Sequence, residues 1–200
     1  MEQIRSFVAI ELPDEVKSAI ARLQNQLKSG GQFPIKWVDP YSIHLTLKFL
    51  GNIDRDMVEE ITRAMDEAVR GVSPFHLEIK GLGVFPNLRR VQVAWVGVSG
   101  DLDQLGELHK RIESNLSPLG FAPESRPFTP HLTLARLRDR ASLNERQSFG
   151  QLVVGTRFES VFSFGVDAIN LMRSQLTSEG PVYTQIGSAK LKRHLSTTAT

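Results

Sequence analysis

At 200 residues, with 40% hydrophobic and 23% charged residues, the chain has the length and composition of one soluble globular domain. It contains no cysteine, which excludes disulfides, thiolate metal sites and a cysteine nucleophile, and which is typical of a reducing cytoplasm. Three of the 24 basic residues, Lys190, Lys192 and Arg193, lie near the C-terminus, and acidic residues outnumber those that remain. The net charge of +2 therefore does not by itself indicate a nucleic-acid partner.

The N-terminus, Met1-Glu2-Gln3-Ile4-Arg5, runs directly into a strand-like segment, so we expect no secretory signal. No apolar stretch approaches the roughly 18 residues that a membrane-spanning helix needs. These features predict a cytoplasmic protein that is not bound to a membrane, and we expect a monomer.

Apolar periodicity and turn residues predict alternating strands and helices in the first half of the chain. The expected elements are strands at residues 7–10, 35–38, 42–50 and 75–85, and helices that open at Asp14, as an N-cap, and at Asp54, and that end at Gly30 and Gly71. The second half repeats this pattern. Its expected elements are strands at residues 91–98, 129–137, 158–164, 166–172 and 182–186, a helix after Gly100, and a weaker helix at 142–153.

The two halves indicate an internal duplication. Each runs strand, helix, His-Leu-Thr-Leu strand, helix, strand, and the spacing agrees: Asp14 precedes His44 by 30 positions, as Asp101 precedes His131. No long polar linker separates the halves. We therefore expect one domain at residues 1–188, with the repeat boundary near 88–90, and a disordered basic tail at residues 189–200.

The duplicated motifs are His44-Leu45-Thr46-Leu47 and His131-Leu132-Thr133-Leu134. Because side chains alternate between the faces of a strand, each leucine pair is expected in a core, and each histidine shares the opposite face with its threonine. Two such strands facing each other would form a symmetric site.

A site of this kind suits the opening of a cyclic phosphodiester by water. One group must take a proton from the water while another protonates the leaving oxygen, and histidine titrates near neutral pH, so one ring can be neutral and the other charged. The threonine hydroxyls could donate to the non-bridging phosphate oxygens, where negative charge gathers in the transition state.

Two other interpretations are weaker. A packing role explains a single buried histidine, but it does not require a polar His and Thr on one face twice. A zinc site would need a third ligand, whereas cysteine is absent and neither motif has an acidic residue at its third position. We therefore expect no metal and no cofactor. His109, beside a leucine stripe, is interpreted as a boundary residue.

The paired motifs resemble those of the 2H phosphoesterase superfamily, and within it the RNA 2′,3′-cyclic phosphodiesterases, also called 2′-5′ RNA ligases. The resemblance spans residues 5 to about 187 and rests on both His-x-Thr-x motifs and on the segments Arg5-Ser6-Phe7-Val8-Ala9-Ile10, Lys48-Phe49-Leu50-Gly51, Gly83-Val84-Phe85-Pro86, Ala135-Arg136 and Gly180-Pro181-Val182-Tyr183.

The resemblance implies a bilobed α+β fold, with two pseudo-symmetric antiparallel sheets and flanking helices around a central cleft. It also implies metal-independent hydrolysis of an RNA terminal 2′,3′-cyclic phosphate to a 2′-phosphate, with the reverse 2′-5′ ligation. Carried over by position, His44 is the proton donor, His131 is the proton acceptor, and Thr46 and Thr133 bind the phosphate. The residues alone leave open which histidine is the acid, because the motifs are nearly identical.

Strict alternation places Lys48 on the face of His44, where it could contact RNA or phosphate, and places Phe49 in the core. Arg136 falls on the face opposite His131 and reaches the cleft only if the strand ends or bulges near Ala135. Arg89-Arg90 and the series Arg136, Arg138 and Arg140 are candidate contacts for the RNA backbone.

Three functions stay open at this level. The first is the phosphodiesterase acting on an RNA 3′ end. The second keeps the chemistry but takes a small cyclic nucleotide phosphate or a 2′-5′ oligonucleotide. The third is an inert module that binds RNA ends, against which the intact histidines and threonines argue.

Overall fold

The computed structural model describes residues 2–158, 162–178 and 180–192. The strands are β1 (Gln3–Glu11), β2 (Ile35–Trp37), β3 (His44–Asp54), β4 (Phe75–Phe85), β5 (Val93–Gly100), β6 (His131–Leu137), β7 (Phe162–Val166), β8 (Ala168–Thr177) and β9 (Gly180–Lys190). The helices are α1 (Asp14–Ser29), α2 (Val58–Val69), α3 (Leu102–Leu116) and α4 (Leu143–Gly155), with short 3₁₀ turns η1 (Pro40–Ser42), η2 (Arg55–Met57) and η3 (Ser117–Leu119).

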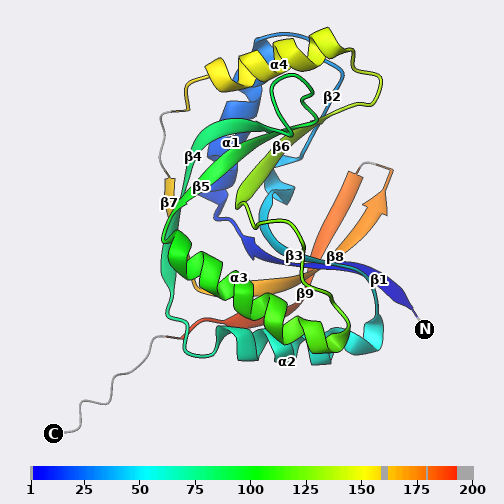
Figure 1. Cartoon of the computed structure of the whole chain (residues 1–200), viewed down its shortest axis with the longest axis vertical. Helices are drawn as coiled ribbons and strands as arrows, with labels where there is room; N and C mark the ends of the chain where they lie inside the picture. The colour runs from blue at the N-terminus through cyan, green and yellow to red at the C-terminus, as the bar shows by residue number, and fades with distance from the viewer. Residues whose placement is uncertain (1, 159–161, 179, 193–200) are drawn as a thin grey trace, which may run out of the picture.

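The strands form two antiparallel sheets, which confirms the expected α+β class. One sheet has four strands in the order β3-β1-β8-β9, and the other has five in the order β2-β6-β5-β4-β7. All the pairings are antiparallel, as hairpins and short connections allow. The two sheets occupy different ends of the molecule, the five-stranded sheet in the upper part of Figure 1 and the four-stranded sheet below it.

Each sheet combines strands from both halves of the chain. The predicted repeat boundary, near residues 88–90, falls in the turn between β4 and β5. Nevertheless β4 pairs with β5, while β8 crosses back to pair with β1. The motif strands are equivalent in this arrangement, because β3 lies next to β1 and β6 lies next to β5.

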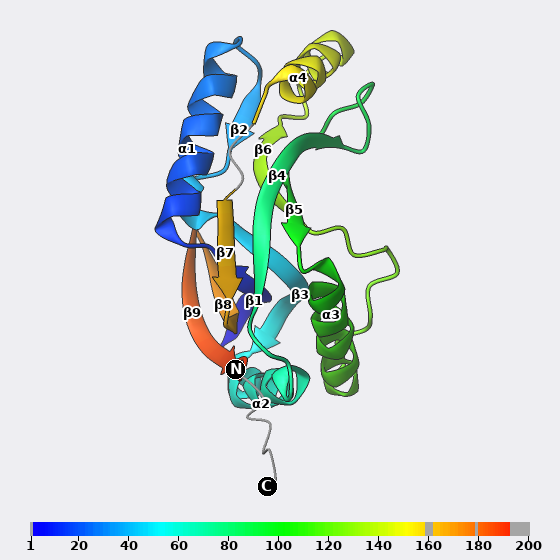
Figure 2. The same ribbon diagram turned by 90° about the vertical axis from the view of Figure 1, so that its left-hand side faces the viewer.

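The helices cover the sheets in pairs drawn from both halves. α1 and α4 lie at the end of the molecule that holds the five-stranded sheet, and α2 and α3 lie at the other end (Figure 2). α2 contacts both α3 and β9, and α4 contacts β4. The apolar stripe of α1, which comprises Val16, Ile20, Leu23 and Leu27, is buried. That of α3 is buried except for Leu102, which is 42% exposed. One hydrophobic core runs through both parts of the molecule and includes the leucines of both motifs.

Several predicted boundaries are wrong; for example, α2 begins at Val58 and not at Asp54. α1 begins at Asp14, with Pro13 at the capping position, so the Asp14 carboxylate lies in the first turn, where it complements the helix dipole. The tail does not begin at residue 189, because β9 runs to Lys190, and Ala189 and Leu191 are buried. Residues 193–200 of the predicted tail lie outside the described residues. Among the helices described, none has both the length and the apolar character to cross a membrane.

Candidate active site

The two motifs occupy equivalent strands, β3 and β6, with the expected alternation. Leu45 and Leu132 are at most 1% exposed and belong to the core, whereas each histidine and each threonine is half-buried on the other face. The β-branched threonines and apolar leucines suit a half-buried strand. Sequence alone therefore predicted which motif residues share a face.

Both strands contain a β-bulge at the same position of the motif. β3 inserts Leu47, directly after Thr46, as an extra residue opposite β1. β6 inserts Leu134, directly after Thr133, as an extra residue opposite β5. Because an extra residue shifts the alternation by one, the side chains that follow it point to the opposite face from the one expected. In β3 this holds as far as Leu50, where a second register shift occurs.

The bulge corrects two predictions for β3. Lys48 does not face the side of His44; it is 2% exposed and pairs behind the sheet with Glu113 of α3. It is therefore not available as a contact for RNA. Phe49, expected in the core, is 62% exposed, and its ring lies 6.2 Å from that of Phe7 on the histidine face.

The equivalent bulge in β6 turns Arg136 to the side of His131. Arg136 occupies the position equivalent to Phe49, five residues after the histidine, and is exposed. Its positive charge acts on the phenol of Tyr183 in β9. Tyr183 in turn contacts the His44 ring edge-on, with 5.0 Å between centroids. The polar face of β6 is thus electrostatically linked to the polar face of the other sheet, and β3 and β6 are also in contact.

The two histidines are held in the same way. His44 Nδ1 donates to the Ser42 carbonyl at 3.0 Å, and His131 Nδ1 donates to the Thr129 carbonyl at 2.7 Å. Because a carbonyl can only accept, each Nδ1 carries hydrogen, and in the neutral ring Nε2 keeps the lone pair. Both rings therefore present Nε2 as the nitrogen that can take or give a proton.

The surroundings of the two rings differ. Phe7 stacks on His44, with 4.4 Å between centroids and 21° between planes. Phe85 instead meets the His131 ring edge-on at 5.0 Å. Burial lowers the pKa of His44 from 6.5 to about 4; the Ser42 carbonyl opposes this change, and the charge of Lys17 adds to it. The His44 ring is thus neutral at pH 7 in the free protein.

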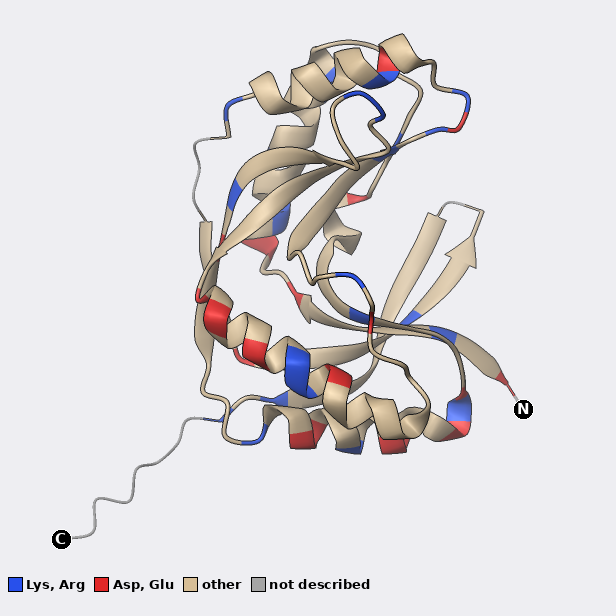
Figure 3. Ribbon diagram, in the orientation of Figure 1, with Lys and Arg blue, Asp and Glu red and all other residues tan. Residues whose placement is uncertain are grey.

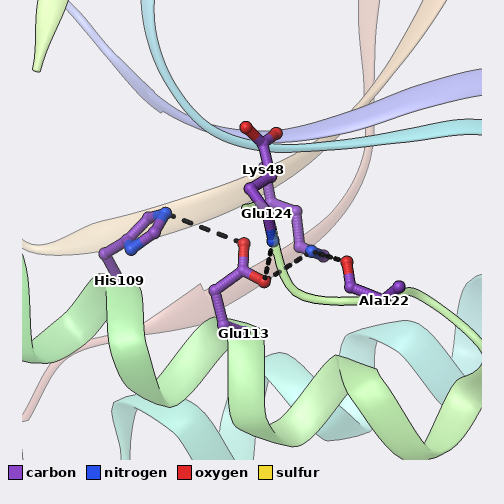
Figure 4. A network of polar contacts seen from close by, with 5 residues as sticks. All are labelled: Lys48, His109, Glu113, Ala122 and Glu124. Carbon is purple, nitrogen blue, oxygen red and sulfur yellow. Dashed lines mark hydrogen bonds and ion pairs between the residues drawn. The ribbon is translucent and has the colours of Figure 1, made fainter. Parts of the chain in front are cut away.

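A second constellation, which sequence reasoning missed, lies behind β3. It joins Lys48 to Glu113 and His109 of α3 and to the segment before β6 (Figure 4). The only sequence signal was His109 beside the leucine stripe of its helix. Within residues 2–158, 162–178 and 180–192, no three His, Cys, Asp or Glu side chains gather in a way that could hold a metal ion.

The low pKa of His44 makes the stability of the protein depend on pH. Since the folded pKa lies below the unfolded value, the unfolded chain binds the proton first as the pH falls. We expect the wild type to lose about 1–3 kcal/mol of unfolding free energy between pH 6.5 and about 4 relative to His44→Gln. Urea unfolding across this range measures the difference. Parallel curves for the two proteins would show that burial does not lower this pKa.

The sequence matches one protein family over nearly its whole length. The family model described as LigT like Phosphoesterase matches twice, at residues 10–95 and again at 96–183. An RNA 2′,3′-cyclic phosphodiesterase of Methanothermobacter thermautotrophicus is 33% identical, over 92% of this chain and 97% of that protein. Another with this name, from Aquifex aeolicus, is 34% identical over 93% and 96%.

Solved structures share the fold. A Thermus thermophilus protein superposes with a TM-score of 0.74 at 27% identity, covering 94% of this chain and 98% of that one. Escherichia coli LigT, solved with 3′-AMP, gives 0.72 at 24% identity, covering 96% and 100%. These matches confirm the resemblance drawn from the paired motifs. The chain belongs to the LigT-like phosphoesterase family, within the 2H superfamily.

Proposed function

We propose that the chain is an RNA 2′,3′-cyclic phosphodiesterase that opens the terminal ring to a 2′-phosphate by two-histidine acid–base catalysis. The observation that carries this proposal is the matched placement of His44 and His131, each with Nδ1 bound to a carbonyl and each two residues before a threonine. The names of the relatives, at 33% and 34% identity, support the substrate class.

In the proposed reaction, His131 Nε2 accepts a proton from water as the water oxygen attacks phosphorus. The bond between phosphorus and O3′ breaks, and His44 Nε2 gives its proton to O3′, so the phosphate stays on O2′. The reverse reaction, attack by a 5′-hydroxyl on the cyclic phosphate end of another RNA, would join the two as a 2′-5′ linkage. The two histidines are then acid and base in exchanged roles.

Three polar side chains are proposed to bind the phosphate. The hydroxyls of Thr46 and Thr133 lie on the faces of the histidines and would donate to the non-bridging oxygens as charge develops there. Arg136, turned to this side by the bulge, adds a guanidinium that can bind phosphate with two parallel hydrogen bonds. No step of this scheme needs a metal ion.

The surface around Arg136 supports an RNA substrate rather than a small nucleotide. Val93 pairs with Arg136, and the Leu137 amide donates to the Gln92 carbonyl, so the β4–β5 turn and the chain after β6 meet at one end of the sheet. Exposed arginines gather there: Arg89, Arg90, Arg136, Arg138 and Arg140. Figure 3 shows basic residues on these turns and acidic residues along α2 and α3. On the other motif strand, the exposed ring of Phe49 offers a surface on which a base can stack.

The first test is a product assay on a short RNA with a 2′,3′-cyclic phosphate end, run in EDTA with the product identified by phosphorus NMR. We expect wild type to form the 2′-phosphate. His44→Ala and His131→Ala should each lose about 10²–10⁴-fold in rate, because each removes one proton transfer. His76→Ala, an exposed histidine of β4, is the matched control and should stay active.

Other outcomes of this assay point elsewhere. A 3′-phosphate product would reverse the proposed direction of ring opening, and loss of activity in EDTA alone would indicate a metal. Without turnover on RNA or on small cyclic phosphates, RNA-end binding by the wild type would support the inert binding module.

The donor role of His44 requires the substrate to raise its pKa from about 4, because a neutral imidazole cannot act as an acid. A phosphate anion beside the ring stabilises the imidazolium. We therefore expect adenosine 2′-monophosphate to move the His44 titration upward by at least about one pH unit, as followed by NMR of the ring C–H. Adenosine, which lacks the phosphate, is the control ligand. An unmoved titration would assign the acid role to His131 instead.

The RNA substrate is distinguished from small cyclic nucleotides by the arginine-rich end of the sheet. Arg89→Ala with Arg90→Ala should raise KM for the RNA and reduce its salt dependence, by about 0.7 in the log–log slope per lost phosphate contact. KM for cytidine 2′,3′-cyclic phosphate should not change. Arg63→Ala with Arg70→Ala, on α2 and at its C-cap, is the control. Equal effects on both substrates would favour the small-nucleotide alternative.

A further inference from the structure

A buried polar network joins the first motif strand to the segment that leads into the second (Figure 4). Lys48 Nζ donates to Glu113 Oε2 at 2.7 Å and to the Ala122 carbonyl at 2.9 Å. The Glu124 amide donates to the same carboxylate oxygen at 3.2 Å. Lys48 of β3 and Glu113 of α3 thereby hold residues 122–124, which lie between η3 and β6.

The same segment is held at a second point, close to His131. The Phe128 ring stacks on His109 of α3, with 4.0 Å between centroids and 9° between planes. Burial lowers the pKa of His109, and the Leu47 carbonyl, at the bulge of β3, is among the groups that oppose this change. The next residue after Phe128 is Thr129, whose carbonyl accepts the hydrogen bond from His131 Nδ1.

The two points at which the segment is held lie close in sequence to the two motifs. Lys48 follows Thr46 by two residues, and Phe128 precedes His131 by three. Glu113 and His109 link Lys48 to Phe128: Glu113 pairs with Lys48, His109 stacks on Phe128, and the Nε2 atom of His109 is 3.7 Å from Glu113 Oε1. We call Lys48, Glu113 and His109 the brace, and residues 121–130 the braced segment.

Stability alone does not account for the brace. A buried ion pair loses hydration, so an apolar pair of similar volume is often equally stable or more stable. An apolar pair could not make directional hydrogen bonds to the backbone. Lys48 donates to the Ala122 carbonyl and Glu113 accepts from the Glu124 amide, and these bonds fix the backbone of the braced segment. A displacement of a catalytic group by about 1 Å can lower a rate on the order of 100-fold.

We propose that the brace is a positioning device, which sets the location of His131 relative to β3 by holding residues 121–130. This inference rests on the proposed function, since it assigns the brace a part in the two-histidine reaction. Lys48, Glu113 and His109 do not touch the substrate in this account; they act through the Thr129 carbonyl and the His131 ring.

The test replaces the ion pair by an apolar pair, Lys48→Met with Glu113→Leu. We expect the thermal midpoint to stay within a few degrees, amide hydrogen exchange in residues 121–130 to rise at least about tenfold, and kcat to fall about 10- to 100-fold with KM little changed. The control is Arg55→Met with Glu2→Leu, which removes an exposed ion pair of 2.8 Å beside the ends of β1 and β3, together with the contact of Glu2 with Arg173. It should alter neither kcat nor this exchange.

The other outcomes would contradict either the positioning role, the anchoring of residues 121–130 or the proposed function. Faster exchange with an unchanged kcat would overturn the positioning role, and unchanged exchange would overturn the anchoring itself. Should the double variant not fold, Phe128→Leu, which removes the ring stack on His109 and keeps an apolar side chain against the core, is expected to lower kcat in the same way; a wild-type kcat would then contradict the proposal. A wild type without turnover would overturn the proposed function, while hydrogen exchange would still report whether the ion pair anchors the segment.

Discussion

The β-bulge after each motif threonine determines what the two strands present to either side. Without it, Lys48 would share the face of His44, and Arg136 would point away from His131. With it, a lysine enters the protein interior and an arginine reaches the polar face. A bulge adds one residue to one strand, and pairing resumes on both sides of it. The histidine and threonine before the bulge therefore keep their face, while the residues directly after it change face. The brace depends on the insertion in β3, and the position of Arg136 depends on the insertion in β6.

The duplication yields two chemically different halves from one pattern. Both imidazoles have the same backbone hydrogen bond and the same free nitrogen. The aromatic residues around the two rings differ. Phe7, which stacks on His44, and Tyr183, which meets it edge-on, help to bury His44, and burial lowers its pKa. Two residues after each bulge, one half carries Phe49 and the other Arg136. The RNA substrate proposed above is asymmetric in the same sense, with a base on one side and a phosphate chain on the other.

Sequence reasoning predicted the elements, the faces of the motif residues and the family, because each depends on local periodicity or on a repeated tetrapeptide. It placed Lys48 and Phe49 on the wrong faces, because strict alternation assumes a strand without a bulge. The bulge at Leu47 is defined by the pairing of β3 with β1, which is distant in the sequence. The stack of His109 on Phe128 and the pairing of Lys48 with Glu113 join residues distant in the chain. Such contacts follow from the tertiary fold and from no local pattern.

The crossing of β8 into the first sheet has a consequence for synthesis on the ribosome. β1, residues 3–11, is an inner strand whose one neighbour is β3 and whose other neighbour is formed by residues 168–177. Until that late segment emerges, β1 exposes an unpaired edge, which is the kind of surface that chaperones protect and that promotes aggregation. The nascent chain therefore cannot complete its first sheet until almost the whole protein has been made, and the N-terminal half alone cannot assemble as a finished unit.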